Sequence, residues 1–257
     1  MTCSLIFARR DFNMLADQGQ RQLATGVLNP GVLLPEEWFE SLIRFISGVL
    51  PGWRDDSVRP AQTGETKLTA QLCSRLNSAS HRTVGWDFLQ FKREEPDEAD
   101  GRRAIDLTVA PRDSVIWIEG RRYTEYQTLL PIECKRLPTP TGVDRDEREY
   151  LYSRFSTTGG IQRFKAGHHG ASHNRAAMIG YVQEQSIPAW NAQLDQWIDD
   201  LETASVRGWS VADKLKLTQH DAESMTAMLQ SEHKRDRDLK DIKIDHLWIE
   251  MCVPADS

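Results

Sequence analysis

Apolar residues recur along this chain with two different periods. In its first third they recur every three or four residues, as on one face of an α-helix, and predict helices over 35–53 and 64–80. Pro35 and two acidic residues open the first helix, and Pro51-Gly52 closes it. Further along, apolar and polar positions alternate, which is typical of β-strands. The pattern therefore predicts helices first and a sheet after them.

The alternating region predicts strands separated by polar or basic turns, such as the segment 120–126. We expect these strands over 86–94, 104–111, 114–119, 129–137, 176–182 and 242–253. A glycine opens a further helix at 159–167, and residues 188–232 have a mostly helical pattern. The fold class is therefore α/β with helical additions.

No repeat or low-complexity linker divides the chain. Residues 1–34 have no strong period and predict an irregular N-terminal extension. We expect a single domain over 35–257, with its core at about 64–182 and a closing strand at about 242–253.

Composition predicts a cytoplasmic globular protein. Of the 257 residues, 39% are hydrophobic and 27% charged, which suits a sizeable core, and no apolar run is long enough to span a bilayer. No signal-peptide pattern begins the chain. The four cysteines are scattered without a CxxC pair, as in a reducing compartment. A formal net charge of -6 means that any contact with nucleic acid must be local.

Two of the predicted strands carry charged residues within their apolar pattern. Residues two apart on a strand share a face, so Ile132 and Cys134 point one way while Glu133 and Lys135 point the other. The same alternation separates Asp106 from the apolar residues beside it. Neighbouring strands would therefore bring Asp106, Glu133 and Lys135 to one surface.

Such a group of charges has a chemical use. Two close carboxylates repel unless a cation lies between them, and hard oxygen ligands favour Mg²⁺, with Mn²⁺ as an alternative. The ion can polarise a phosphate and lower the pKa of an attacking water, while Lys135 orients that water or stabilises developing negative charge. The plainer interpretation is a salt bridge between Glu133 and Lys135 on a solvated strand.

The spacing of these residues resembles that of the PD-(D/E)xK nucleases. Asp106 is followed, after 26 residues, by Glu133-Cys134-Lys135 as the ExK element. The resemblance implies a restriction-endonuclease-like core, a central mixed β-sheet flanked by helices. It also implies metal ligation by Asp106, Glu133, the Cys134 carbonyl and Glu65, a further acid at a helix start. That position for Glu65 is equally favoured by the helix dipole alone.

The chain departs from the family pattern in two places. The first half of the motif is Ala-Ile-Asp rather than Pro-Asp, and Gln162 is followed by Ala166 where some members have Gln-x-x-x-Tyr.

Taken as a whole, the resemblance implies an Mg²⁺-dependent deoxyribonuclease. It would hydrolyse DNA phosphodiester bonds as the nuclease component of a restriction or anti-phage defence system. The sequence contains no P-loop motif, so we expect a partner to supply ATPase, helicase or recognition activity. A homodimer would let two sites cut two strands. The alternatives are a nuclease acting on RNA, and a non-catalytic nucleic-acid-binding or scaffold subunit.

Several basic or polar residues flank the expected catalytic strands and are candidate phosphate contacts. They are Arg102, Arg103, Gln162, Arg163, His168 and His169. The arginine pair has a second interpretation as ordinary turn charges. The spacing of His169 and His173 suits a zinc site, but the glycine between them favours a solvent loop. We expect Trp190, Trp197 and Trp209 to lie in the core.

Overall fold

A computed structural model describes residues 35–97, 100–118, 121–155, 159–235 and 239–251. The predicted N-terminal extension over 1–34 lies outside this part of the chain. The α-helices of the described residues are α2 (Pro35–Arg54), α3 (Glu65–Arg82), α4 (Gly160–Lys165) and α5 (Ile187–Thr203). The strands of the main sheet are β1 (Leu89–Pro96), β2 (Ala104–Pro111), β5 (Leu130–Leu137), β6 (Arg175–Val182), β7 (Lys216–Asp221), β8 (Thr226–His233) and β9 (Ile242–Glu250).

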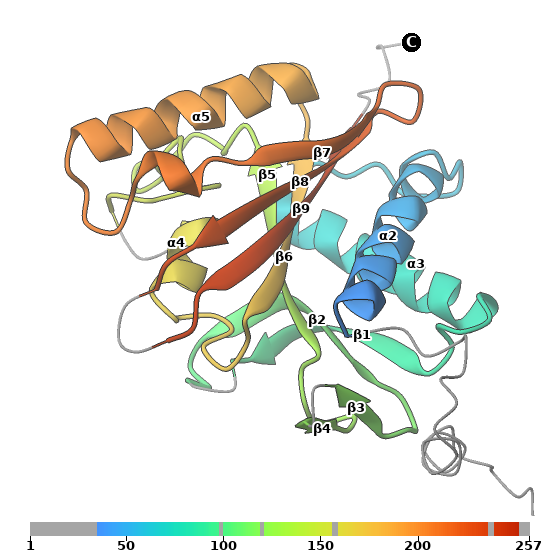
Figure 1. Ribbon diagram of the computed structural model, residues 1–257. Helices are drawn as coiled ribbons and strands as arrows, with labels where there is room; N and C mark the ends of the chain where they lie inside the picture. The colour runs from blue at the N-terminus through green and yellow to red at the C-terminus, as the bar shows by residue number, and fades with distance from the viewer. Residues whose placement is uncertain (1–34, 98–99, 119–120, 156–158, 236–238, 252–257) are drawn as a thin grey trace, which may run out of the picture.

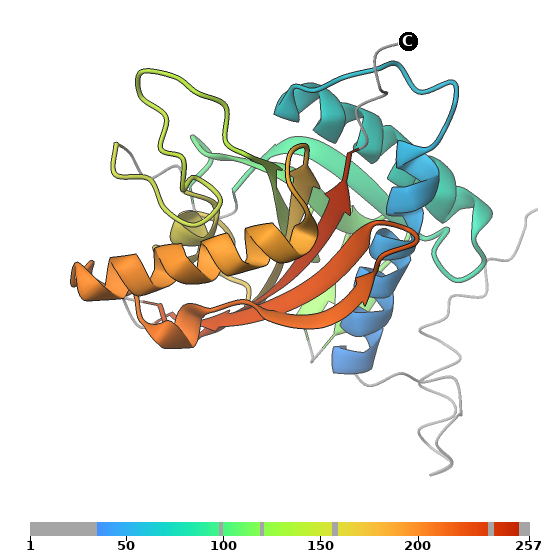
Figure 2. The same cartoon turned by 90° about the horizontal axis from the view of Figure 1, so that it is seen from above.

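The seven strands form one mixed sheet in the order β1-β2-β5-β6-β9-β8-β7 (Figure 1). The pairs β5–β6 and β6–β9 are parallel, and the other neighbours are antiparallel. Helices α2 and α3 cover one face, while α4 and α5 cover the other, as the view from above shows (Figure 2). The fold is therefore an α/β sandwich of three layers. None of its described helices combines the length and hydropathy that a membrane span requires.

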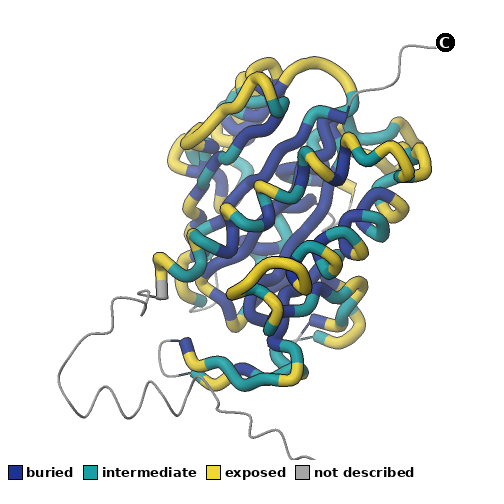
Figure 3. The backbone as a smooth tube through the Cα atoms, turned by 90° about the vertical axis from the view of Figure 1, so that its right-hand side faces the viewer, coloured by how far each residue is buried: buried dark blue, intermediate teal, exposed yellow. Residues whose placement is uncertain are grey.

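A separate hydrophobic core lies on each face of the sheet. Beneath α2 and α3, Leu68 and Leu72 pack with Ile132 and Cys134 of β5. Beneath α4 and α5, the core includes Leu137 at the end of β5. The central strands are buried between these layers, and exposure is concentrated at the periphery (Figure 3). Because side chains alternate along β5, Glu133 and Lys135 face the α4 side with Leu137.

Many of the predicted elements are confirmed. Strand β2 has the predicted bounds, β5 begins one residue late, and α2 and α3 differ from prediction by one or two residues. The three tryptophans predicted for the core are buried in the α5-side cluster: Trp190, Trp197 and Trp209. Strand β9 occupies the predicted closing position as far as Glu250, and the last two residues of the prediction lie outside the described part of the chain.

Two predictions of secondary structure are wrong. Residues 188–232 are not mostly helical, because only α5 is a long helix and the segment then forms β7 and β8. Part of the turn predicted at 120–126 is a short strand, β4 (Arg121–Tyr123), which pairs with β3 (Ile116–Ile118) in a separate two-stranded sheet. The inward face of β8 carries the polar residues Ser231 and His233. They interrupt the alternation of apolar and polar residues by which a strand is predicted from sequence.

The inward residues of β8 belong to a buried hydrogen-bond network. Asp213 accepts from Nδ1 of His233 at 2.6 Å and also pairs with Lys165. Burial raises the pKa of Asp213, but these two partners outweigh it and hold the carboxyl ionised. Burial lowers the pKa of His233, so its imidazole is neutral, and its other nitrogen accepts from Ser231 at 2.7 Å.

The network continues from Ser231 toward the centre of the sheet. Since the hydroxyl hydrogen of Ser231 is directed to His233, Nε2–H of His246 donates to Ser231 Oγ at 2.7 Å. Nδ1 of His246 then accepts from the Tyr150 hydroxyl at 2.9 Å, which itself accepts from Trp248 Nε1–H at 2.8 Å. Every member thus has a donor or acceptor of the correct type, so the network stabilises the packing of β8 on β9.

We expect Ser231→Ala to destabilise the fold. It leaves one nitrogen of His233 and one of His246 buried without a partner, at a cost of about 1–3 kcal/mol for each. Chemical denaturation followed by circular dichroism measures the free energy of unfolding. Ser78→Ala, on the exposed side of α3, is the control and should change it little. Equal stability of the two variants would contradict the proposed network.

Candidate active site

Strands β2 and β5 separate partway along their length. Their pairing runs from Val109 opposite Leu130 to Leu107 opposite Ile132 and goes no further. Beyond that point the backbone of β5 needs other partners at this edge, because a buried N–H without one is costly. The gap between the two strands is where the charged residues gather.

Two acidic side chains replace the missing strand partner. Cys134 N–H donates to Asp106 Oδ2 at 2.8 Å, and Arg136 N–H donates to Glu65 Oε2 at 3.1 Å. A strand residue directs its N–H and C=O to the same neighbour, so the Cys134 carbonyl also faces this edge. Asp106, Glu65 and a backbone carbonyl are thus brought to one place.

Glu133 lies behind this edge and is fully buried. Its Oε1 pairs with Lys135 Nζ at 2.9 Å and with Arg163 Nη1 at 2.7 Å. Its Oε2 pairs with His169 Nδ1 at 3.1 Å. Lys135 also approaches Glu65, with 3.4 Å between Nζ and Oε1. The structure therefore brings together all four residues that the sequence proposes as catalytic: Glu65, Asp106, Glu133 and Lys135.

The short helix α4 positions Arg163. It begins at Gly160, where a Cβ would contact Met178 and come within 2.9 Å of the Tyr150 carbonyl oxygen. Only glycine lets the helix start so close to the sheet. Arg163, one turn later, then reaches Glu133, and the loop after α4 brings His169 to the other carboxylate oxygen.

The charges of the cluster shift each other's pKa. Burial alone would raise the pKa of Glu133, but Lys135, His169 and Arg163 outweigh burial and hold that pKa well below its usual range. Burial would lower the pKa of Lys135, yet the carboxylates of Glu133, Glu65 and Asp106 raise it above its usual value. Glu133 is therefore ionised and Lys135 protonated at neutral pH.

Asp106 shifts in the opposite direction from Glu133. Burial and the neighbouring charge of Glu133 raise its pKa to about 7, against the opposing effect of Lys135. A small cavity of about 30 Å³ leads to this carboxyl and is lined by six residues. They are Glu65, Thr66, Thr69, Arg93, Glu94 and Asp106. Its size suits a single water molecule or ion.

The residues around this cavity fit a divalent cation. Burial and the neighbouring charge of Glu133 disfavour the ionised form of Asp106, and a cation beside it would compensate that negative charge. Glu65, Asp106 and the Cys134 carbonyl supply the hard oxygen donors that Mg²⁺ prefers. Within the described ranges, no group of three or more His, Cys, Asp or Glu side chains is arranged so that it could hold a metal ion. The oxygens of Glu133 are occupied by basic side chains, so its ligation would require one of them to move.

The other candidate residues are divided between the cluster and its surroundings. Arg163 and His169 contact Glu133 directly. Gln162 is directed elsewhere, with its Oε1 accepting from Ser153 N–H at 3.1 Å and Gly159 N–H at 3.3 Å. Arg102 and Arg103 pair with Asp100 in the turn before β2.

The two remaining histidines of the 168–173 loop differ in their surroundings. His168 follows α4, and its backbone N–H donates to the Arg163 carbonyl at 2.8 Å. His173 is buried, and its Nε2 lies 2.8 Å from the Thr128 carbonyl. His169 and His173 therefore engage different partners, Glu133 and Thr128.

Sequence reasoning missed two residues that surround Cys134. Thr69 and Tyr181 share a hydrogen bond at 3.2 Å, and both lie beside the Cys134 thiol. Burial, followed by the charge of Asp106, raises the pKa of that thiol well above its usual value, so it is not a nucleophile. Thr69 lies one helical turn after Glu65, and this spacing is the signal that could have identified it.

No family model, curated protein or solved structure matches this chain. The interpretation of the site therefore depends on its own geometry and chemistry.

The raised pKa of Asp106 predicts a pH-dependent stability in the absence of divalent ions. A carboxyl with a higher pKa in the folded state stabilises the fold below pH 4 and loses that contribution as the pH rises toward 7. Asp106→Asn keeps an oxygen that can accept from Cys134 N–H but does not ionise. Between pH 4 and 8 the variant should gain on the order of 2–4 kcal/mol over the wild type.

Urea denaturation in EDTA across this pH range measures the difference. Asp113→Asn changes an exposed carboxyl and is the control, expected to follow the wild type. Parallel curves for Asp106→Asn and the wild type would show that Asp106 has an ordinary pKa.

Proposed function

We propose that this protein is an Mg²⁺-dependent nuclease of the PD-(D/E)xK type with a restriction-endonuclease-like core. The observation that supports the proposal most directly is the convergence of Asp106, Glu65 and the Cys134 carbonyl at the unpaired edge of β5. Lys135 and Glu133 of the ExK element lie directly behind them. These five groups come from three elements that are far apart in the sequence.

In this proposal Asp106, Glu65 and the Cys134 carbonyl would hold the metal, and Glu133 would join them once one of its basic partners moves away. The bound ion would polarise the scissile phosphate and lower the pKa of the attacking water. Lys135 remains protonated, so its ammonium stabilises negative charge on the phosphate and does not act as a base. Water would attack phosphorus directly and lose its proton to solvent as the new P–O bond forms. The P–O bond to one sugar oxygen would break, that oxygen would take up a proton from solvent, and no covalent intermediate would form on the protein.

Arg163 and His169 act on the reaction through Glu133. They hold its carboxylate in place at 2.7 and 3.1 Å and keep it ionised. Arg163 is about one-fifth exposed, so it can also reach a phosphate at the surface. We assign both residues a positioning role.

The substrate we propose is DNA, in a restriction or anti-phage defence setting. The sequence lacks a P-loop motif, so an associated ATPase, helicase or recognition protein would supply what this chain does not. Since one site hydrolyses one bond, cleavage of both strands favours a homodimer.

A nicking and linearisation assay with supercoiled plasmid in Mg²⁺ tests the activity. We expect Asp106→Asn and Lys135→Ala each to reduce the rate by at least about 10²-fold, as loss of one group that stabilises transition-state charge does. Lys67→Ala, on an exposed position of the same helix as Glu65, is the control and should retain activity. Cleavage by Lys135→Ala at the wild-type rate would contradict the role given to Lys135.

One observation favours a second candidate, a non-catalytic binding subunit. Glu133 is fully paired with the protein's own basic side chains, so this carboxylate needs no metal to compensate its charge. Isothermal titration with Mg²⁺ and Mn²⁺ separates the two candidates. The nuclease requires a binding signal that Asp106→Asn abolishes, whereas the binding subunit gives no signal in either protein.

Replacing the plasmid by a single-stranded RNA of matched length distinguishes a ribonuclease. We expect DNA to be cleaved faster. Preferential cleavage of the RNA, lost in Lys135→Ala, would keep the mechanism and change the substrate.

A further inference from the structure

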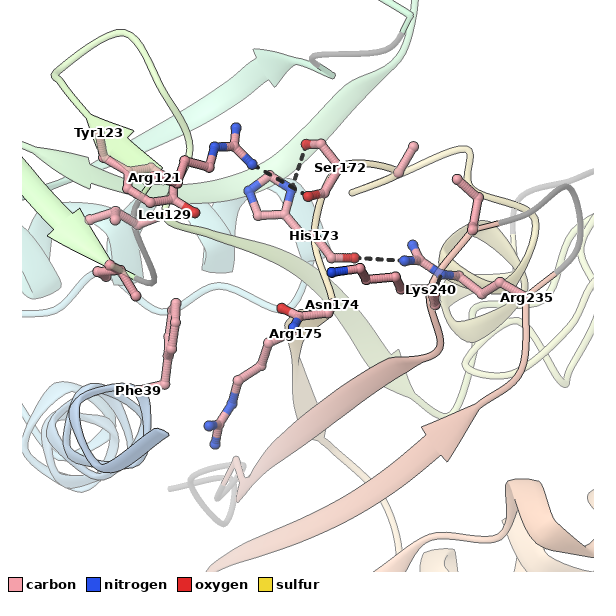
Figure 4. Close-up of a pocket in the computed structure, with 13 residues that line it drawn as sticks. Phe39, Arg121, Tyr123, Leu129, Ser172, His173, Asn174, Arg175, Arg235 and Lys240 are labelled. Carbon is pink, nitrogen blue, oxygen red and sulfur yellow. Dashed lines mark hydrogen bonds between the residues drawn. The ribbon is translucent and has the colours of Figure 1, made fainter. Parts of the chain in front are cut away.

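A second cavity lies away from the catalytic cluster, near the start of β6. It has a volume of about 360 Å³, at the lower end of the range for small-molecule sites. Segments distant in the sequence surround it, including α2, the β3–β4 hairpin, the loop before β6 and the segment before β9 (Figure 4). Such convergence is typical of binding pockets.

The polar lining of this pocket is cationic. Arg121, Arg175, Arg235 and Lys240 all line it, and none of the lining residues within the described part of the chain is acidic. This composition is unusual in a chain whose formal net charge is -6. Positive charge concentrated in one place attracts an anion.

Two of the cations have structural duties. Arg235 donates to the Gly170 and His173 carbonyls at 3.0 and 2.7 Å, which fixes the loop before β6. Arg175 pairs with Asp245 at 2.8 Å and lies over the ring of Phe39. Its Nη2 is nevertheless buried without a hydrogen-bond partner, and a buried guanidinium nitrogen left this way favours an added acceptor.

The other two cations are nearer the surface. Arg121 lies over the ring of Tyr123, and its Nη1 donates to the Ser172 carbonyl at 3.3 Å. Lys240 is exposed, and Figure 4 shows its side chain extended toward Asn174. These two side chains can approach a ligand without disturbing the core.

Apolar and aromatic residues make up much of the remaining lining, and Ser172, His173 and Asn174 add polar groups. Phe39 and Leu239 are partly exposed and supply surface against which a flat ring can pack. Asn174 supplies an exposed amide, the group that pairs with the edge of adenine in nucleic-acid recognition. The pocket therefore combines anion recognition with room for a planar, hydrogen-bonding ring.

We propose that this pocket binds a single nucleotide, with its phosphate at Arg121 and Lys240 and its base against the apolar side near Asn174. A nucleotide has an anion, a planar ring and a hydrogen-bonding edge in one small molecule. The ligand can be a free nucleotide or the 5′-phosphorylated end of a strand. The inference does not rest on the proposed nuclease activity, because no residue of the catalytic cluster lines the pocket.

Isothermal titration with AMP in EDTA tests the proposal without metal at the catalytic cluster. We expect binding at submillimolar concentration, weakened at least about 10-fold in the double variant Arg121→Ala/Lys240→Ala. The matched control is Arg122→Ala/Lys234→Ala, which removes two neighbouring exposed charges that do not line the pocket. Its affinity should equal that of the wild type. Lys240→Glu changes a single exposed residue, so it tests the same phosphate contact even if the double variant misfolds.

Three further ligands define what is recognised. Adenosine and inorganic phosphate should each bind at least about 10-fold more weakly than AMP, and equal binding of either would overturn the nucleotide assignment. Failure of AMP to bind, or equal binding by the double variant and its control, would overturn the site. A 5′-phosphorylated oligonucleotide that competes with AMP would extend the ligand to strand ends, whereas one that does not compete would restrict it to free nucleotides.

Discussion

The carboxylate of Glu133 is fully buried in the middle of the sheet, and much of the surrounding architecture compensates for its charge. An ionised carboxylate without partners in such a place would cost far more than a domain's net stability. Three basic side chains pair with this carboxylate. Lys135 lies on the same strand, whereas Arg163 lies on α4 and His169 in the loop that follows it. The close start of α4 at Gly160 and the path of that loop are therefore tied to one side chain.

The second constraint is the early separation of β2 from β5. Loss of strand pairing at this point would leave buried N–H groups of β5 without acceptors. Asp106 and Glu65 supply those acceptors in place of the missing strand. The same gap admits the small cavity beside Asp106. The same two carboxylates meet the structural need for acceptors and are the ones proposed as metal ligands, so sequence alone cannot separate the two roles.

The strand alternation was sufficient to predict β2, β5 and the shared placement of Asp106 with Glu133 and Lys135. It failed for β8, where Ser231 and His233 occupy inward positions that usually hold apolar residues. The plainer interpretation, a salt bridge on a solvated strand, is wrong because Glu133 and Lys135 are buried on the face of β5 that α4 covers. The pairing of Arg163 and His169 with Glu133 has no local sequence signal, because it depends on how closely α4 packs against the sheet.

Protonation distinguishes two of the buried polar clusters among the described residues. In the network through Ser231, ordinary tautomers satisfy every group, and the two histidines are simply kept neutral by burial. In the cluster at β5, the pKa values of two neighbouring carboxyls shift in opposite directions. That of Glu133 is lowered, and that of Asp106 is raised to about 7. A network built only for packing has no need of such a division, whereas opposed pKa shifts beside an accessible cavity are typical of a site that handles charge. This difference is the physical reason for proposing chemistry at β5 rather than at β8.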